Sequence, residues 1–412
     1  MTAKGPSGES KGMVPSRGKA GAWFLAIMFL GYLAFSADRT VLSAMLQPLS
    51  AALGFGKTVS FGIAETAWLA AAQFMGVLAF VLVSGYLSDR YGHRRVIMLG
   101  LAVFTAFTWL IATASNFQEA FLYRLVSGFG EGIFWPAAMS AVANYFGRNK
   151  GLALGIFYAG FDLGGAAGNT IGSITFSVTS DWRTAFYVAP LIGIPVIAGV
   201  FASKNPFSVA ATRTGTLSIG RDALGLLRSR KVSAIMAFAF LATWASVWQV
   251  AYLPYYYRSV FNTSVAQSAL TAAAVLVAGM AGKAVFGRLS DTIRRDRLLI
   301  SLSIVVVGLY GIFFATPDLA VAILSAVAAG FFSSALFPVM QALASDSSGG
   351  RTGTVLGLTT TFQSVAAVIG VLLPGALLSF GVKSAFAFGA IAPALAMTVA
   401  ALFLRESRGE RP

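Results

Sequence analysis

Cysteine is absent from this 412-residue chain, and with it any chemistry that needs a thiol. Disulfides, thiolate metal sites, cysteine nucleophiles and thiol redox roles are all excluded. Only one histidine is present, and the sequence shows no nucleophile–histidine–acid set and no metal-ligand cluster, so we expect no enzyme, no metal and no other cofactor. Charged residues are scarce at 11%, whereas hydrophobic residues make up 57%. A chain this apolar is predicted to be an integral membrane protein.

Twelve apolar runs of spanning length fill most of the sequence. A helix needs about 20 apolar residues to cross a bilayer, and the alternating pattern of membrane strands is missing. We therefore predict an all-α integral membrane fold with twelve transmembrane helices. The expected spans are 22–49, 66–87, 96–114, 118–145, 151–176, 184–203, 233–257, 266–288, 298–315, 319–345, 351–379 and 383–404.

Lysine and arginine fall mainly on one side of these spans. If the N-terminus is cytoplasmic, 23 of the 30 basic residues lie in tails and loops on that side, four lie in outer loops, and Arg39, Arg124 and Lys283 lie within spans. This bias predicts a multi-pass protein of the cell inner (plasma) membrane with both termini cytoplasmic. It also accounts for the net charge of +15, so no nucleic-acid partner is expected. The basic N-terminal tail lacks an apolar h-region and is expected to be a cytoplasmic tail, not a cleaved signal peptide.

An internal repeat predicts the architecture. Gly85-Tyr-Leu-Ser-Asp89 recurs 202 positions later as Gly287-Arg-Leu-Ser-Asp291, and the same offset relates Gly128 to Gly330. Two tandem copies of six spans, both inserted the same way up, are expected to hold a site between them. The predicted parts are a cytoplasmic tail at 1–21, an N-terminal bundle at 22–203, a basic cytoplasmic linker at 204–232, a C-terminal bundle at 233–404 and a second tail at 405–412.

Charges inside the spans are concentrated in the first copy. Arg124 and Glu131 are two helical turns apart, so they share one face at a separation of about 10.5 Å along the axis and should point into one cavity. Asp38 and Arg39 lie in the first span. Ionisable residues in spans pair with one another or mark substrate and proton pathways. The alternative is a buried ion pair that only locks helix packing.

These segments also carry a family resemblance. Gly85-Tyr-Leu-Ser-Asp-Arg-Tyr-Gly-His-Arg-Arg95 resembles the signature loop of the major facilitator superfamily. Asp38-Arg39-Thr-Val-Leu-Ser43 and Arg124-xxx-Gly128-x-Gly130-Glu131-xxxx-Pro136 are similar to the anion:cation symporters, which include sialic acid, vesicular glutamate and bacterial sugar-acid carriers. The spinster-like lipid transporters show a similar Asp-Arg pair. The resemblance implies the major facilitator fold of two pseudo-symmetric six-helix bundles.

We therefore expect a secondary active transporter that symports protons with a small organic anion, a carboxylate or sugar acid, by alternating access. Arg39 and Arg124 are expected to bind the anion, since a guanidinium offers a carboxylate two hydrogen bonds. Glu131 is expected to carry the coupling proton. Asp38 is either a second proton site or the counter-ion of Arg39, and the resemblance to sugar-acid carriers favours the former. The alternatives are a spinster-like lysolipid or amphiphile transporter and a proton-antiport exporter of drugs or metabolites.

Other polar and aromatic residues in the spans complete the expected site. Asp162 is either a further proton-coupling residue or a hydrogen-bond partner of a neighbouring helix. Lys283 is expected to extend to the cytoplasm or to pair with an acid such as Asp346, in a structural role. Trp248 and Gln249 are expected to line the cavity. Tyr255 and the two tyrosines after it are expected to form an aromatic belt at the outer membrane interface.

The signature loop is expected to act as a latch on the cytoplasmic side and not to bind substrate. Its predicted gating residues are Gly85, Asp89, Arg90, Arg94 and, in the second copy, Asp291. The arginines are expected to meet headgroups and the C-terminal ends of helices. His93 is expected to be a solvated loop residue. The predicted partners are the small organic anion, protons and the lipid bilayer, for a protein that is expected to be a monomer.

Overall fold

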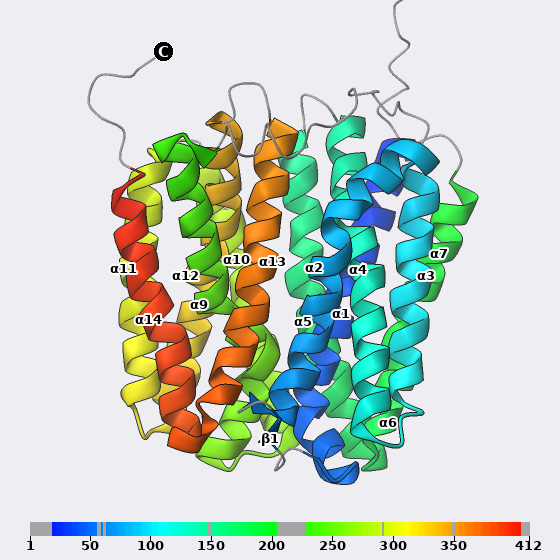
Figure 1. Cartoon of the computed structure of the whole chain (residues 1–412), viewed down its shortest axis with the longest axis vertical. Helices are drawn as coiled ribbons and strands as arrows, with labels where there is room; N and C mark the ends of the chain where they lie inside the picture. The colour runs from blue at the N-terminus through cyan, green and yellow to red at the C-terminus, as the bar shows by residue number, and fades with distance from the viewer. Residues whose placement is uncertain are drawn as a thin grey trace, which may run out of the picture.

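Long helices that run along one direction dominate the computed structural model, which describes residues 19–55, 59–60, 63–146, 150–203, 227–290, 292–347 and 352–404 (Figure 1). The first six spans in this part of the chain are α1 (Lys19–Ala52), α2 (Glu65–Tyr91), α3 (His93–Ile111), α4 (Phe117–Phe146), α5 (Lys150–Thr179) and the broken helix α6 (Trp182–Val188) and α7 (Gly193–Ala202). The second six are α9 (Arg230–Phe261), α10 (Val265–Leu289), α11 (Arg295–Ala315), α12 (Leu319–Asp346), α13 (Thr352–Ala376) and α14 (Val382–Leu402).

The predicted all-α membrane fold is confirmed over the described residues. Nine of these segments are long and apolar enough by themselves to cross a membrane, and α2, α4 and α5 run beside them in the same bundle (Figure 1). Helices suit this environment because each satisfies its own backbone hydrogen bonds where lipid offers none. Large apolar side chains such as Leu122, Leu324 and Phe388 remain exposed on the outer surface, as lipid-facing positions require.

Three local features were not predicted. The sixth span is interrupted by the 3-10 turn η2 (Ala189–Ile192), where Pro190 has no backbone N–H to continue the α-helical ladder. Between α1 and α2, strands β1 (Val59–Ser60) and β2 (Ile63–Ala64) form a small antiparallel hairpin. A second 3-10 turn, η3 (Leu378–Phe380), precedes α14. The hairpin and η3 lie near the ends of spans and η2 lies inside the sixth span, and the apolar pattern encodes none of these local backbone paths.

Glycines let the helices of each half approach closely. A methyl group on Gly128 of α4 would lie 2.2 Å from the carbonyl oxygen of Gln73 on α2, and one on Gly330 of α12 would lie 2.5 Å from that of Val275 on α10. Both the glycines and their partners are related by the 202-residue offset, so the two copies pack in the same way at this crossing. In α5, Gly164 and Gly168 pack in the same manner against the backbone of α1.

The two sets of six helices stand side by side, with α9–α14 on the left and α1–α7 on the right in Figure 1. They meet where α5 packs on α10, α2 on α13 and α1 on α9. The described chain begins and ends at the same end of the bundle (Figure 1), as an even number of spans requires. The interface between the halves is therefore where a central cavity is expected.

Candidate functional site

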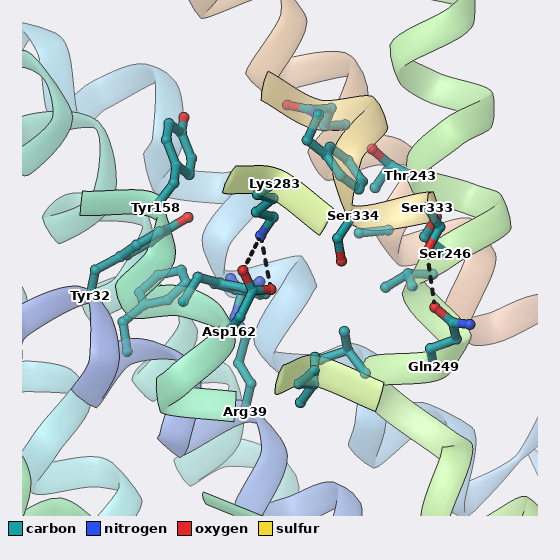
Figure 2. A pocket seen from close by; sticks show the side chains of 18 of the residues that line it. Tyr32, Arg39, Tyr158, Asp162, Thr243, Ser246, Gln249, Lys283, Ser333 and Ser334 are labelled. Atoms are coloured by element: carbon teal, nitrogen blue, oxygen red, sulfur yellow. Dashed lines mark hydrogen bonds and ion pairs between the residues drawn. The ribbon is translucent and has the colours of Figure 1, made fainter. Parts of the chain in front are cut away.

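A cavity of about 190 Å³ lies between the two halves of the protein. Helices α1, α2, α4 and α5 form one wall, and α9, α10, α12 and α13 form the other. Figure 2 shows its labelled side chains pointing inward from both sets of helices. The site is thus assembled from segments far apart in the sequence, and neither half encloses it alone.

The two walls differ in chemistry. Six aromatic residues line the wall of the first half: Tyr32, Phe35, Phe74, Trp135, Tyr158 and Phe161. The opposite wall carries hydroxyl and amide groups, including Thr243, Ser246, Gln249, Ser333, Ser334 and Ser364. One wall can therefore cover a flat apolar body, while the other can hydrogen-bond to polar substituents.

Arg39 is the guanidinium on the aromatic wall. Its side chain is 11% exposed and lies between the rings of Phe35 and Phe74, with Cζ 4.3 and 4.9 Å from the ring centres. Its Nε and Nη2 atoms donate to Oε2 of Glu131 at 2.9 and 2.8 Å. Glu131 is fully buried. The ion pair therefore joins a cation at the cavity to an acid behind the wall.

A second ion pair lies deeper in the same half. Arg124, which is 2% exposed, donates from Nη1 to Oδ1 of Asp38 at 3.1 Å and also to the backbone carbonyls of Asp38 and Arg39. Ser127 and Thr108 donate further hydrogen bonds to the Asp38 carboxylate. The neighbouring α1 and α3 thus surround this pair with hydrogen-bonding groups, which a buried charge requires.

Gln73 connects the two pairs. Its side-chain Nε2 donates to Oδ2 of Asp38 at 2.7 Å and to Oε1 of Glu131 at 2.6 Å. The four charged residues and this amide form one buried network of two cations and two carboxylates. A change of charge at Glu131 therefore alters its ion pair with Arg39 directly and affects Asp38 through the amide of Gln73.

The structure corrects two expectations about these pairs. Asp38 is the counter-ion of Arg124 and not of Arg39, because adjacent residues of a helix point about 100° apart and cannot face one another. Arg124 does not line the cavity; its guanidinium is occupied by Asp38 and by two carbonyl groups of α1. Arg124 therefore positions α1 against α4 and lies behind the surface that a ligand meets.

Removing Arg124 should expose this structural role. Arg124→Ala is expected to lower the free energy of unfolding by about 3–5 kcal/mol, because it leaves the Asp38 carboxylate buried and unpaired. Asp38→Asn in the same chain should restore part of the loss, as measured by thermal unfolding of the purified protein in detergent. The matched control is Asp346→Asn, which removes an exposed surface pair with Arg295 and should change stability by at most about 1 kcal/mol. Native stability in Arg124→Ala would contradict this role.

Lys283 is placed differently from its prediction. It neither reaches the cytoplasm nor pairs with Asp346; it pairs with Asp162 inside the cavity, and Asp346 pairs with Arg295 instead. Side chains tilt toward the N-terminus of their helix, so Lys283, which is six residues before the end of α10, extends away from that end. Asp162 lines the cavity. This position fits both of its predicted roles, proton coupling and pairing with a neighbouring helix.

The aromatic residues of α9 are also reassigned. Trp248 does not line the cavity; it is 1% exposed and packs among Tyr256, Tyr310, Phe313 and Phe314 within the second half. The predicted aromatic belt is wrong for Tyr256, which this cluster buries, and for Tyr257, whose hydroxyl donates to the carbonyl of Ala322. Gln249 does line the cavity and accepts a hydrogen bond from Ser333 at 3.5 Å (Figure 2).

The structure places only some of the predicted gating residues. Gly85, Asp89 and Arg90 are in the last turns of α2, and Asp291 falls outside the described residues. Arg94, at the start of α3, donates to the carbonyls of Val200 and Phe201 near the C-terminal end of α7. His93 is not solvated but buried, with Nε2 3.0 Å from Oγ of Ser140. The gating role of this segment remains a prediction.

Sequence reasoning missed two parts of the site. Gln73 is the sole strongly polar side chain between Trp68 and Val77, and a polar amide within an apolar run was a signal that could have been used. The aromatic wall had only a weak signal: Tyr32 and Phe35 on α1, and Tyr158 and Phe161 on α5, are each three residues apart on one helical face, but nothing in the sequence shows that the two faces meet. Among the described residues, no cluster of three or more acidic or histidine side chains could hold a metal ion.

Twelve helices in two sets of six around a central cavity define a secondary transporter. Matches to the model of the Major Facilitator Superfamily cover residues 28–281 and 235–412, and the chain belongs to this family. It is a family of transporters and not of enzymes. A bacterial homologue of the human lysosomal transporter Spinster has the same fold, with a TM-score of 0.69, 16% identity, and coverage of 94% of this chain and 95% of that chain.

Relatives carry several kinds of cargo. The 3-(3-hydroxy-phenyl)propionate transporter of Escherichia coli (strain K12) is 25% identical over 383 residues, which cover 88% of this chain and 89% of that protein. Probable anion transporter 6, chloroplastic, of Arabidopsis thaliana is 24% identical over 392 residues, 85% of this chain and 72% of that protein. The methylenomycin A resistance protein of Bacillus subtilis (strain 168) is 24% identical over 216 residues, 52% of this chain and 45% of that protein.

Proposed function

We propose that the protein symports protons with a small organic anion, a carboxylate, and does so by alternating access. The observation that carries this proposal is the Arg39–Glu131 pair, which presents a cation to the cavity while a fully buried acid holds it from behind. A cation suited to a carboxylate and a protonatable acid in direct contact are the two parts that such coupling needs.

Competition for Arg39 provides the coupling. While Glu131 is ionised it occupies both Nε and Nη2 of Arg39. A proton on Glu131 removes its charge, so Arg39 can then pair with the anion of the substrate. Loss of the substrate restores the pull of Arg39 on Glu131 and favours release of the proton. Proton and anion thus occupy the network together or leave it together, which is symport.

The body of the substrate is proposed to be aromatic. Six rings on one wall can stack against a flat apolar group, and the hydroxyl and amide groups opposite can bind a polar substituent. A hydroxyphenyl-propionate has this shape, and the relative from Escherichia coli is named for carrying one. A sugar acid fits the hydroxyl wall but would leave the aromatic wall without an apolar partner.

A proton-antiport drug exporter is the second candidate, and the match to a resistance protein favours it over part of the chain. The aromatic wall would suit an apolar drug as well. Such a cargo would nevertheless leave Arg39 paired with Glu131 throughout, and the buried network would then have no part in binding. If the protein were instead a spinster-like amphiphile carrier, short carboxylates would likewise not be expected to bind.

We further propose that both termini are cytoplasmic, because the basic loops lie on that side. The protein is proposed to be a monomer in the inner membrane, and its two halves, which the linker at 204–232 joins, are proposed to rock against each other. The segment from Gly85 to Arg95 is proposed to hold the cytoplasmic side closed.

Thermal stabilisation of the purified protein by different ligands distinguishes these candidates. We expect 3-(3-hydroxyphenyl)propionate and other aromatic carboxylates to raise the melting temperature of the purified protein. The matched controls are the corresponding aromatic amides, which keep the ring and lose the charge, and cyclohexane carboxylates, which keep the charge and lose the flat ring. Stabilisation by the amides alone, or by lysolipids alone, would favour an exporter or an amphiphile carrier instead.

A further inference from the structure

A second cation–carboxylate pair crosses the cavity from one half of the protein to the other. Lys283 of α10 lies 2.9 Å from Oδ1 and 2.8 Å from Oδ2 of Asp162 on α5 (Figure 2). Both residues line the cavity, with the Lys283 side chain 15% exposed and that of Asp162 2% exposed. The ammonium is also 5.4 Å from the centre of the Phe161 ring. A bound molecule can therefore reach the cation of this pair.

The packing of α5 on α1 does not account for the pair. Gly164 and Gly168 form the face of α5 that packs on α1, and Asp162 lies two residues before Gly164, about 200° around the helix. The internal repeat does not account for it either, since the 202-residue offset relates Asp162 to Ser364 and Lys283 to Val81. Two charges that line the cavity, away from the face of α5 that packs on α1 and outside the internal repeat, point to a functional role.

We propose that the substrate opens this pair: its anionic group takes the place of Asp162 on Lys283, and the freed Asp162 carboxylate takes up one proton. This inference rests on the proposed anion symport and adds a second anion-binding residue and a second coupling proton to it. Lys283 remains an ammonium throughout. Together with the proton on Glu131, one anion then enters with two protons, so loading adds one positive charge to the buried network.

The proton is needed because Asp162 has no alternative cation. The described residues that line the cavity contain two cations, Lys283 and Arg39, and Glu131 of α4 already holds Arg39. The other ionisable side chains facing this region are Tyr32 of α1 and Tyr158 of α5 itself. A buried carboxylate without a partner is strongly unfavourable. Asp162 can therefore leave Lys283 only in its neutral form, which ties anion binding to proton uptake.

Opening of the pair also changes the contact between the halves. The pair joins α5 of one half to α10 of the other, and these helices pack directly on each other. An interaction that exists only in the empty carrier favours the empty conformation, and its loss on loading frees the halves to move. Arg39, by contrast, pairs within its own half.

Proton counting tests the coupling part of the proposal. With 3-(3-hydroxyphenyl)propionate as the probe, Asp162→Asn should keep anion binding and lose one proton per anion transported, as measured by parallel proton and anion uptake in proteoliposomes. Lys283→Gln should bind the probe about tenfold more weakly or worse, the scale for one charged hydrogen bond. Asp346→Asn, which breaks a surface pair, should leave both quantities unchanged. An unchanged proton ratio in Asp162→Asn would overturn the proposal.

A second arm needs no substrate. Because the chain has no cysteine, Ser334→Cys places a single thiol on the cavity wall. Adding Asp162→Asn or Lys283→Gln should raise its rate of maleimide labelling several-fold, and Asp346→Asn should not. The double variant Asp162→Asn/Lys283→Gln removes both charges and should fold even where a single variant does not. Equal labelling in all of these proteins would overturn the link between the halves.

The two arms separate this inference from the function on which it rests. If Glu131→Gln abolishes proton-driven uptake but Asp162→Asn keeps the parental proton ratio, the symport proposal stands and this inference is wrong. If no carboxylate stabilises the parent protein, the symport proposal fails, and the labelling of Ser334→Cys still decides whether the pair links the halves.

Discussion

Glu131→Gln is expected to remove one coupling proton per anion, so that accumulation of the anion against its gradient falls to what Asp162 alone can drive, while exchange between equilibrated compartments continues. The neutral amide resembles the protonated acid, so Arg39 is left permanently available to the substrate. The side chain can no longer release or take up a proton, and the proton gradient then has no means to drive the cycle through this residue. Uptake into proteoliposomes with and without an imposed pH gradient measures the two activities separately.

The matched control for this substitution lies on the same helix. Glu119 is in the first turn of α4, is half-buried and hydrogen-bonds only to the loop before that helix in the contacts described, from Ser115 and Asn116. Glu119→Gln should therefore accumulate the anion as the parent does. A parental level of accumulation and a parental proton ratio in Glu131→Gln would show that Glu131 carries no coupling proton.

The fold was predictable because the bilayer restricts what a chain can do. A spanning segment needs enough apolar residues to cross the hydrocarbon, so the apolar runs located the helices to within a few residues at most ends. The 202-residue repeat predicted two equivalent halves, and Gly128 and Gly330 occupy equivalent crossings with α2 and α10. The break at Pro190 inside the sixth span and the hairpin between α1 and α2 were missed, since apolarity does not encode the local backbone path.

The site was predictable only along single helices. Helical spacing placed Arg124 and Glu131 on one face, but it wrongly indicated that both point into the cavity, because both side chains lie in the buried network behind it. It could also have shown that Asp38 and Arg39 diverge. It could not indicate which side chains of neighbouring helices meet. The pairing of Arg39 with Glu131, and of Lys283 with Asp162, depends on the lateral arrangement of α1, α4, α5 and α10. No periodicity within one helix records that arrangement.

Arg39→Ala is expected to weaken anion binding by about 100-fold or more. The loss of a buried charge-assisted contact costs about 3 kcal/mol, and each 1.4 kcal/mol is about tenfold in affinity. Arg39→Lys keeps the charge but cannot offer two parallel N–H groups or fill the space between Phe35 and Phe74, so an intermediate loss is expected. Titration of the purified protein with an aromatic carboxylate, followed by melting temperature or calorimetry, gives these affinities.

A loss of binding in Arg39→Ala could also result from lost stability, because the substitution leaves Glu131 as an unpaired buried carboxylate. Arg39→Ala/Glu131→Gln removes both charges and should recover stability without recovering affinity. Arg124→Ala/Asp38→Asn removes the deeper pair in the same way and should retain most of the affinity, because Arg124 lies behind the cavity wall. The opposite result, in which the folded Arg39 double variant binds normally and the Arg124 double variant does not, would reverse the assignment. Arg124 would then become exposed to the anion in another conformation of the carrier, and the Arg39–Glu131 pair would be structural.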